Sequence, residues 1–227
     1  MLCALLLLGS RLVVPGAIEG VVRLEGKPPL PASIPVTRDQ EACGQEKPDE
    51  SLVVSPEGNL QYAVVSLRGA PAEPPPETAA EVALDQRGCR YHPHVLAARQ
   101  GSRLVVVNSD TVLHNAHATR GTQTVFNYAF PMTGARRNAQ LGEAGVLKLS
   151  CEAGHSWMSG FIAVFPHRFF AVTDQRGHFR LEGVPAGEHE LEIWHEPRGG
   201  KGEPVVRTVK VKVKEGATAR ATVALEL

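Results

Sequence analysis

The chain has 227 residues, which is long enough for one large domain or for two modest ones that each bury a core. Its 24 Lys and Arg residues balance 24 Asp and Glu residues, so the charge favours neither nucleic acid nor a membrane surface as a partner. Frequent Gly and Pro, few aromatics and short Val-rich runs are typical of an all-β chain with many turns.

The first 17 residues, "MLCALLLLGSRLVVPGA", form an apolar stretch that ends in small residues. The stretch is interrupted by Arg11, and a span of the bilayer needs about 20 apolar residues. A secretory signal cleaved near Gly16 or Ala17 fits better, although no basic residue precedes the apolar run; an uncleaved anchor is the alternative. We therefore expect a periplasmic or secreted protein with no membrane span in the mature chain.

Patterns of strands and turns follow from residue 18 to the end of the chain. Residues 18–36 predict a strand, a Gly turn and an extended Pro-rich segment, and residues 59–69 predict a second strand. The run "APAEPPPET", 70–78, is a proline-rich linker that cannot continue a regular element. Short strands separated by turns fill 81–165, and alternating apolar positions from 169 onward indicate a half-buried antiparallel sheet. Since no helical periodicity is sustained, we predict an all-β fold.

Removal of the signal segment would leave three cysteines in the mature chain. Cys43 and Cys89 lie in polar, turn-like stretches, whereas Cys151 lies close to a histidine and a methionine. In an oxidising compartment an odd number of cysteines allows one pair and leaves one thiol over. We therefore predict a disulfide between Cys43 and Cys89 and a free thiol at Cys151.

The C-terminal part carries the stretch "TDQRGHFRLEGVPAGEHELEIW", 173–194. Together with "GVVRLEGKPP" and "AVVSLRG", which lie before the linker, it resembles the carboxypeptidase regulatory-like family, a small transthyretin-like β-sandwich. The resemblance implies one sandwich that an insertion divides, because chain ends that lie close together at a surface tolerate insertions. The alternative is two consecutive domains, the first over 18–166. The predicted organisation is a signal at 1–17, sandwich parts at 18–78 and 167–227, and a separate domain at 79–166.

The stretch "VLKLSCEAGHSWMSGFIAVF", 146–165, places Cys151, His155 and Met158 in one loop between two apolar runs. Upstream, "VVVNSDTVLHNAH" presents His114 after a strand and a loop. On these residues, segment 79–166 resembles a cupredoxin, the copper-binding Greek-key sandwich of plastocyanin and amicyanin. The resemblance implies copper bound by His114, Cys151 and His155 with Met158 as a weak axial ligand, a donor set that suits both oxidation states of copper.

The same resemblance gives two further residues a role. It implies that Asn115 connects the two ligand segments through hydrogen bonds, and that electrons leave through the edge of His155, beside Trp157. The loop has three residues between Cys151 and His155, whereas amicyanin-like carriers have two. The longer spacing is similar to that of the dinuclear copper centre of cytochrome oxidase, but the upstream cysteine of that motif is Leu147 here. The resemblance therefore favours a single copper.

We expect one-electron transfer to an unidentified redox partner protein and no enzymatic activity. Copper storage or delivery is one alternative, and a structural or adhesion sandwich with a vestigial site is another. In the latter, Cys151 is a small buried residue and Met158 fills the core. No catalytic triad, pair of carboxylates or phosphate-binding Gly loop is evident. Two other histidines, His92 and His94, could form an accessory metal site. His117 could support the ligands from nearby. No role follows from the sequence for His167 and His195.

Overall fold

The computed structural model describes residues 14–74, 78–200 and 202–227. Most of the predicted signal segment and the centre of the proline-rich linker therefore lie outside the described residues. The described chain is built almost entirely from β-strands, which confirms the all-β prediction. Its short helical elements are α1 (Gln40–Cys43) and the 3-10 turn η1 (Arg198–Gly200).

In the part of the chain that the structure describes, no helix is long and apolar enough to cross a membrane.

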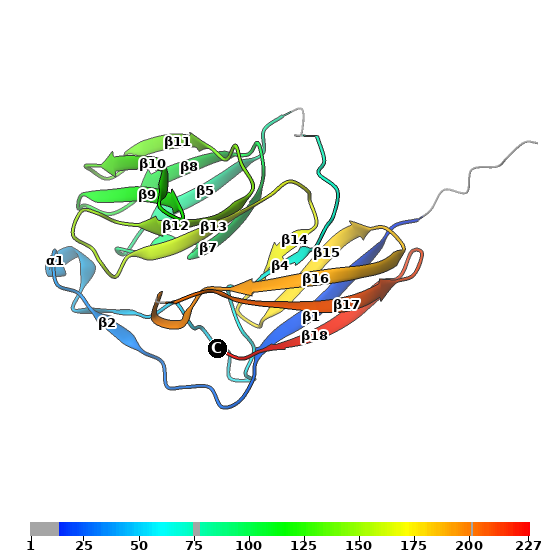
Figure 1. Cartoon of the computed structure of the whole chain (residues 1–227). Helices are drawn as coiled ribbons and strands as arrows, with labels where there is room; N and C mark the ends of the chain where they lie inside the picture. The colour runs from blue at the N-terminus through cyan, green and yellow to red at the C-terminus, as the bar shows by residue number, and fades with distance from the viewer. Residues whose placement is uncertain (1–13, 75–77, 201) are drawn as a thin grey trace, which may run out of the picture.

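Two sheets at the lower right of Figure 1 combine strands from both ends of the chain. One sheet has the order β15–β1–β18 and the other β14–β4–β16–β17. The first strand β1 is antiparallel to β15 and parallel to β18, and β4 lies between β14 and β16. We call this pair of sheets the terminal sandwich. Its strands are β1 (Gly16–Leu24), β4 (Val64–Leu67), β14 (Phe170–Val172), β15 (His178–Val184), β16 (Gly187–His195), β17 (Val205–Val213) and β18 (Thr218–Leu225).

A close backbone approach fixes β1 between its neighbours. A Cβ atom on Gly20 would lie 2.0 Å from the carbonyl oxygen of Ala221 and 2.7 Å from the ring of Phe179. Only a residue without a side chain fits there, and this explains the glycine in the middle of the strand. The inward-facing Ile18 and Val22 are fully buried in the core of this sandwich.

The middle of the chain forms a second pair of sheets, which we call the central sandwich (Figure 1). Its sheets have the orders β10–β9–β12–β13–β7 and β11–β8–β5–β6. Their inward-facing apolar side chains form a separate buried cluster that includes Leu104, Leu149 and Ile162. The strands are β5 (Glu81–Gln86), β6 (Tyr91–His92), β7 (Val95–Arg99), β8 (Arg103–Asn108), β9 (His114–Arg120), β10 (Gln123–Phe130), β11 (Arg136–Gln140), β12 (Gly145–Ser150) and β13 (Ser159–Phe165).

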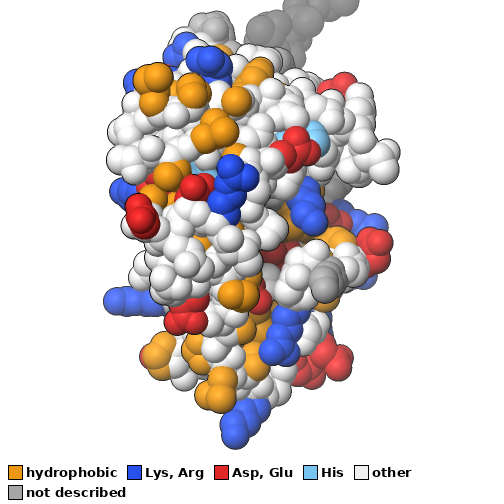
Figure 2. Space-filling model, turned by 90° about the vertical axis from the view of Figure 1, so that its left-hand side faces the viewer, with side chains coloured by type: hydrophobic (Ala, Val, Ile, Leu, Met, Phe, Trp, Pro, Cys, Tyr) orange, Lys and Arg blue, Asp and Glu red, His pale blue; other side chains and the backbone are white. Residues whose placement is uncertain are grey.

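Residues 33–48 leave the terminal sandwich and cross to the central one; we call them the strap. The strap pairs β2 (Ser33–Pro35) with β3 (Glu46–Pro48) and carries α1 between them. Although the sequence prediction placed these residues in the first part of the terminal sandwich, Val36 and Cys43 are buried in the core of the central one. Figure 2 views the side of the molecule on which α1 lies, and there basic, acidic and apolar side chains are intermingled.

The predicted disulfide between Cys43 and Cys89 is confirmed, with a sulfur–sulfur distance of 2.04 Å. It joins the end of α1 to the turn between β5 and β6. Cys151 is a free thiol, as predicted, and it is buried. The strap is thus attached covalently to the central sandwich.

The two sandwiches meet through an apolar cluster and a buried charged pair. Val64 of β4 packs against Val95, Phe161 and Ala163 of the central sandwich. Beside this cluster, His94 Nε2 makes a hydrogen bond with the carboxylate of Glu196, and both side chains are 2% exposed. Burial by itself lowers the pKa of His94, but the hydrogen bond and charge of Glu196 outweigh it and raise the pKa above the ordinary value.

Candidate metal centre

Two loops at one end of the central sandwich bring the predicted ligands together. Asn108, which is fully buried at the end of β8, donates from its side-chain amide to the carbonyl oxygens of Val112 and Phe130 and so folds the loop that precedes His114. In the other loop, between β12 and β13, Gly154 has a positive φ of 97°. This conformation, which glycine adopts without strain, turns the chain so that His155 faces back toward Cys151.

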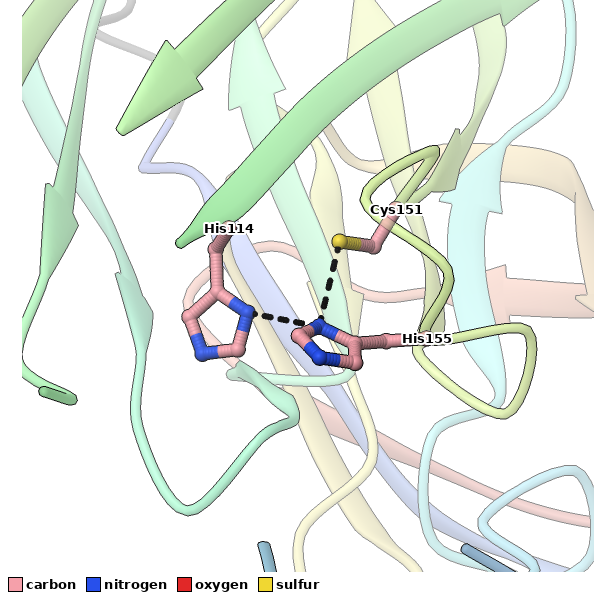
Figure 3. Close-up of side chains that lie close together, drawn as sticks. All are labelled: His114, Cys151 and His155. Carbon is pink, nitrogen blue, oxygen red and sulfur yellow. Dashed lines mark hydrogen bonds between the residues drawn. The ribbon is translucent and has the colours of Figure 1, made fainter. Parts of the chain in front are cut away.

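Three potential donor atoms converge inside this end of the sandwich (Figure 3). The Nδ1 atoms of His114 and His155 are 3.0 Å apart, and the Sγ atom of Cys151 lies 3.6 Å from Nδ1 of His155. All three side chains are buried and offer ligand atoms within 4.8 Å of one another. The structure therefore brings His114 together with Cys151 and His155, which follow it by 37 and 41 positions in the sequence.

Each imidazole is held from behind by a carboxylate. His114 Nε2 lies 2.8 Å from Oδ2 of Asp110, and His155 Nε2 lies 2.8 Å from Oδ2 of Asp39. Burial alone would raise the pKa of Asp110, but hydrogen bonds from the backbone N–H of Cys89 and from His114 outweigh it and lower the pKa. The hydrogen bond with His155 lowers the pKa of Asp39. Both carboxylates are therefore ionised at neutral pH and only accept hydrogen bonds.

These carboxylates determine where the imidazole protons lie. An ionised carboxylate can only accept a hydrogen bond, so each histidine carries its hydrogen on Nε2, the atom that faces the carboxylate. A neutral ring then presents a lone pair at Nδ1. Burial lowers the pKa of His114, which favours its neutral form. Burial likewise raises the pKa of the Cys151 thiol, so the thiol proton stays on sulfur when no cation is present. When both rings are neutral, the thiol of Cys151 has one proton to donate, whereas two inward lone pairs, on Nδ1 of His114 and of His155, lie 3.0 Å apart.

The donor set fits a thiophilic metal ion. A lone pair without a donor costs about 1–3 kcal/mol when buried, and a cation placed among the three atoms removes this cost. Two imidazole nitrogens and a thiolate are ligands that copper and zinc accept. The fit thus follows from the chemistry and orientation of the residues present.

Backbone contacts support the predicted link between the two ligand segments. The N–H of Asn115 lies 3.3 Å from Sγ of Cys151, and the N–H of Glu152 donates to Oδ1 of Asn115. This confirms the connecting hydrogen bonds predicted for Asn115. The hydroxyl of the buried Tyr91 lies 2.5 Å from the carbonyl oxygen of Asn115 and 2.9 Å from that of Ser150, so it joins the same two segments.

The edge of His155 is not exposed to solvent, and electron exit through that edge stays a prediction. His155 has an exposed fraction of 0% because Asp39 of the strap covers Nε2 and Trp157 lies beside the ring, with 5.1 Å between centroids. Trp157 is itself buried and donates from its indole nitrogen to the carbonyl oxygen of Cys89. The sequence could not show this, since the covering residue comes from 116 positions away.

Met158 is 1% exposed and belongs to the same buried cluster as Cys151. Its backbone N–H donates to the carbonyl oxygen of His155, which closes the turn of the ligand loop. Axial ligation by Met158 stays a prediction.

The remaining histidines make contacts of their own and do not join the three donors. His117 lies between Glu152 and Thr124, at 2.7 and 2.8 Å. His92 contacts the carbonyl oxygen of Arg87, whereas His94 contacts Glu196 at the junction of the sandwiches. Among the described residues, neither His92 nor His94 belongs to a cluster of three or more potential ligands, and the accessory pair stays a prediction. His167 and His195 are buried away from this site: His167 Nδ1 accepts from the N–H of Phe169, and His195 Nδ1 donates to the carbonyl oxygen of Glu196.

Sequence reasoning missed both carboxylates. Asp110 had a usable signal, because an acidic residue four positions before a predicted ligand in a tight loop is well placed to contact it. Asp39 had none, because its contact with His155 depends on the path of the strap.

No family model matches the sequence, and no curated protein matches it. Solved structures similar to part of the chain include a Cu-containing nitrite reductase from Thermus scotoductus, with 24% identity and a TM-score of 0.33 over 43% of this chain and 24% of that one. A purple cupredoxin from Nitrosopumilus maritimus has 24% identity and a TM-score of 0.31 over 37% and 98%. A Cu(I) form of an amicyanin variant has 19% identity and a TM-score of 0.33 over 44% and 97%. The matched part is less than half of this chain, which itself spans about a quarter of the nitrite reductase.

Proposed function

We propose that the protein binds a single copper ion through His114, Cys151 and His155, with Met158 as a weak axial ligand, and serves as a one-electron carrier. The observation that carries the proposal is the convergence of Nδ1, Nδ1 and Sγ, with both imidazoles oriented by carboxylates. Bound copper would supply a centre that accepts and releases one electron.

The choice of copper over zinc follows from the donors. Two imidazoles and one thiolate with a thioether nearby suit Cu(I) and Cu(II), whereas structural zinc sites hold four strong ligands. Thioether sulfur is a poor ligand for zinc, so a site completed by Met158 favours copper. Because the two histidines are buried and hydrogen-bonded, their positions would change little between the oxidation states of copper, which favours rapid electron transfer.

The setting of the site favours a carrier over a delivery protein. Delivery requires that the metal be exposed to the acceptor, but His114 and His155 are 0% exposed and Cys151 is 6% exposed. The disulfide fits an oxidising compartment, and on this basis we propose a periplasmic or secreted protein.

The redox partner would dock on the surface beside His114, which is as buried as His155 but lies near exposed apolar side chains. His114 pairs with Phe130 at the end of the β9–β10 ladder, so the segments around Leu113 and Met132 meet there. These two side chains are 47% and 64% exposed, although large apolar residues are usually buried. A small apolar patch suits a partner protein that must dissociate after each transfer.

For the domain organisation, we propose a regulatory-like sandwich interrupted by a copper domain. The strand orders β15–β1–β18 and β14–β4–β16–β17 support this organisation. In each sheet one strand from before residue 78, β1 or β4, lies between strands from after residue 167. The strap, 33–48, is then a part of the first segment that serves the inserted domain.

The test is copper titration of the purified protein, followed by visible spectroscopy and metal analysis. We expect one copper per chain and an intense band from charge transfer between the Cys151 thiolate and Cu(II). Cys151→Ser should abolish the band because a hydroxyl does not provide that bonding. The matched control is His117→Gln, which changes a nearby imidazole that binds Glu152 and Thr124.

Copper that stays bound in Cys151→Ser with an unchanged spectrum would contradict the ligand assignment. A wild-type protein that takes up no stoichiometric copper would instead favour a structural module. A reversible one-electron couple with slow metal exchange supports the carrier, and rapid transfer of Cu(I) to a competing chelator supports delivery.

A further inference from the structure

We propose that Asp39 is a positioning residue for the metal centre and that the strap, 33–48, is a fixed cover that holds Asp39 against His155. This inference rests on the proposed function, because it concerns the same site. It assigns a role to a segment that lies outside the central sandwich in sequence.

The first observation is the unusual use of Asp39. It occupies the N-cap position of α1, where an aspartate normally accepts hydrogen bonds from the first helical N–H groups. Here the side chain makes no such bond and instead accepts from Nε2 of His155 at 2.8 Å. Its backbone has φ 51° and ψ 38°, a left-handed conformation that costs about 1–3 kcal/mol outside glycine. The residue thus forgoes a helix cap and adopts a strained conformation to contact the histidine.

The second observation is how firmly the strap is anchored. Val36 and Cys43, on either side of Asp39, are 2% and 1% exposed within the core of the central sandwich. The N–H of Val36 donates to the carbonyl oxygen of Gln45, which closes the base of the strap. The side chain of Arg38 lies over Gly154 of the ligand loop, where a Cβ atom would be 2.9 Å from Cδ of Arg38. The strap therefore packs on the ligand loop through more than one residue.

The third observation is that one disulfide connects the supports of both histidines. Cys43 donates its N–H to the carbonyl oxygen of Asp39, at 2.8 Å. Its disulfide partner Cys89 donates its N–H to Oδ2 of Asp110, at 2.7 Å, and that same oxygen contacts His114. Asp39 and Asp110 therefore belong to one covalently joined frame around the centre.

Two consequences follow from this frame. Asp39 fixes the hydrogen of His155 on Nε2, so Nδ1 points inward before any metal binds. Its negative charge, added to those of Asp110 and the thiolate, favours a divalent over a monovalent cation in the centre. Loss of that charge should therefore raise the reduction potential and speed the release of copper.

The experiment compares Asp39→Ala and Asp39→Asn with the wild type. Glu41→Gln, which removes an exposed acidic side chain two positions away on α1, is the matched control for charge. Proteins loaded with Cu(I) are mixed with an excess of a Cu(I) chelator, and the rate of copper loss is recorded. We expect loss to be about 10- to 100-fold faster in Asp39→Ala and unchanged in Glu41→Gln.

A second readout reports positioning directly. Cu(I) is diamagnetic, so long-range proton–nitrogen NMR spectra can identify the Nε2–H of His155. In the wild type this proton should be visible and protected from exchange with water, and in Asp39→Ala it should exchange rapidly. Asp39→Asn retains a carbonyl acceptor of nearly the same shape, so it should keep the proton but raise the reduction potential.

The outcomes separate this inference from the proposed function. Absence of copper binding in the wild type overturns both. Normal copper binding with the same release rate and the same protected proton in Asp39→Ala overturns only the role of Asp39 and the strap. If Asp39→Ala does not fold, the nearly isosteric Asp39→Asn decides, and an unchanged potential and release rate in that variant overturn the inference.

Discussion

Replacing Cys43 and Cys89 together with alanine tests how much the disulfide stabilises the protein. The bond closes a loop of 46 residues between the strap and the central sandwich. In the chain-entropy treatment, a loop of that length corresponds to about 4 kcal/mol at 25 °C, because the cross-link restricts the unfolded chain. For a protein of this size, that loss lowers the midpoint of thermal unfolding by about 8–16 °C.

The assay is urea denaturation followed by circular dichroism, with calorimetry for the midpoint. Both sulfur atoms are buried, so the alanine variant also loses packing. Reduction of the wild-type protein by a phosphine removes the cross-link while keeping both sulfurs, and it isolates the entropic part. Cys151→Ala is the control, since it removes a buried thiol without opening a loop, and should cost about 1 kcal/mol. A double variant and a reduced wild type that are no less stable than this control would refute the reasoning.

Three further variants test the axial ligand, the junction and the terminal sandwich. Met158→Leu should keep copper but raise its reduction potential, measured by voltammetry, and an unchanged potential would exclude axial ligation. Glu196→Gln should lose about 1–3 kcal/mol of stability near pH 6. Because the pKa of His94 is raised in the folded state, this loss should shrink as the pH rises through that value; urea curves at pH 6 and 9 with equal losses would contradict the pairing. Gly20→Ala should cost about 1–3 kcal/mol or more in chemical denaturation, whereas Gly142→Ala, with nothing within 4 Å of its Cβ, should be nearly neutral; equal effects would contradict the close approach at β1.

Much of the ligand set could be predicted because it is encoded locally. Cys151 and His155 lie in one short loop, and the two apolar runs that flank it become β12 and β13, which pair residue by residue. A tight loop between paired strands leaves its side chains near one another whatever the rest of the chain does. His114 could be added from the family resemblance, and the structure places its Nδ1 beside that of His155.

The support of the ligands could not be predicted in the same way. Asp39 lies 116 positions from His155, and nothing in the residues around it distinguishes it from an ordinary helix cap. The pairing of His94 with Glu196 spans 102 positions and links two sandwiches. Such contacts depend on how whole sheets pack, which short-range patterns do not record.

The sequence by itself determined the all-β class, the pairing of two cysteines and the residues that can ligate a metal, because residue period, cysteine parity and spacing within a loop are local properties. Only the tertiary structure decided that strands from both chain ends share sheets, that the strap crosses to the central sandwich, and that His155 is covered. These features arise when distant segments bury their apolar faces against each other. That packing decides which distant side chains come into contact, so these contacts cannot be predicted from the local sequence.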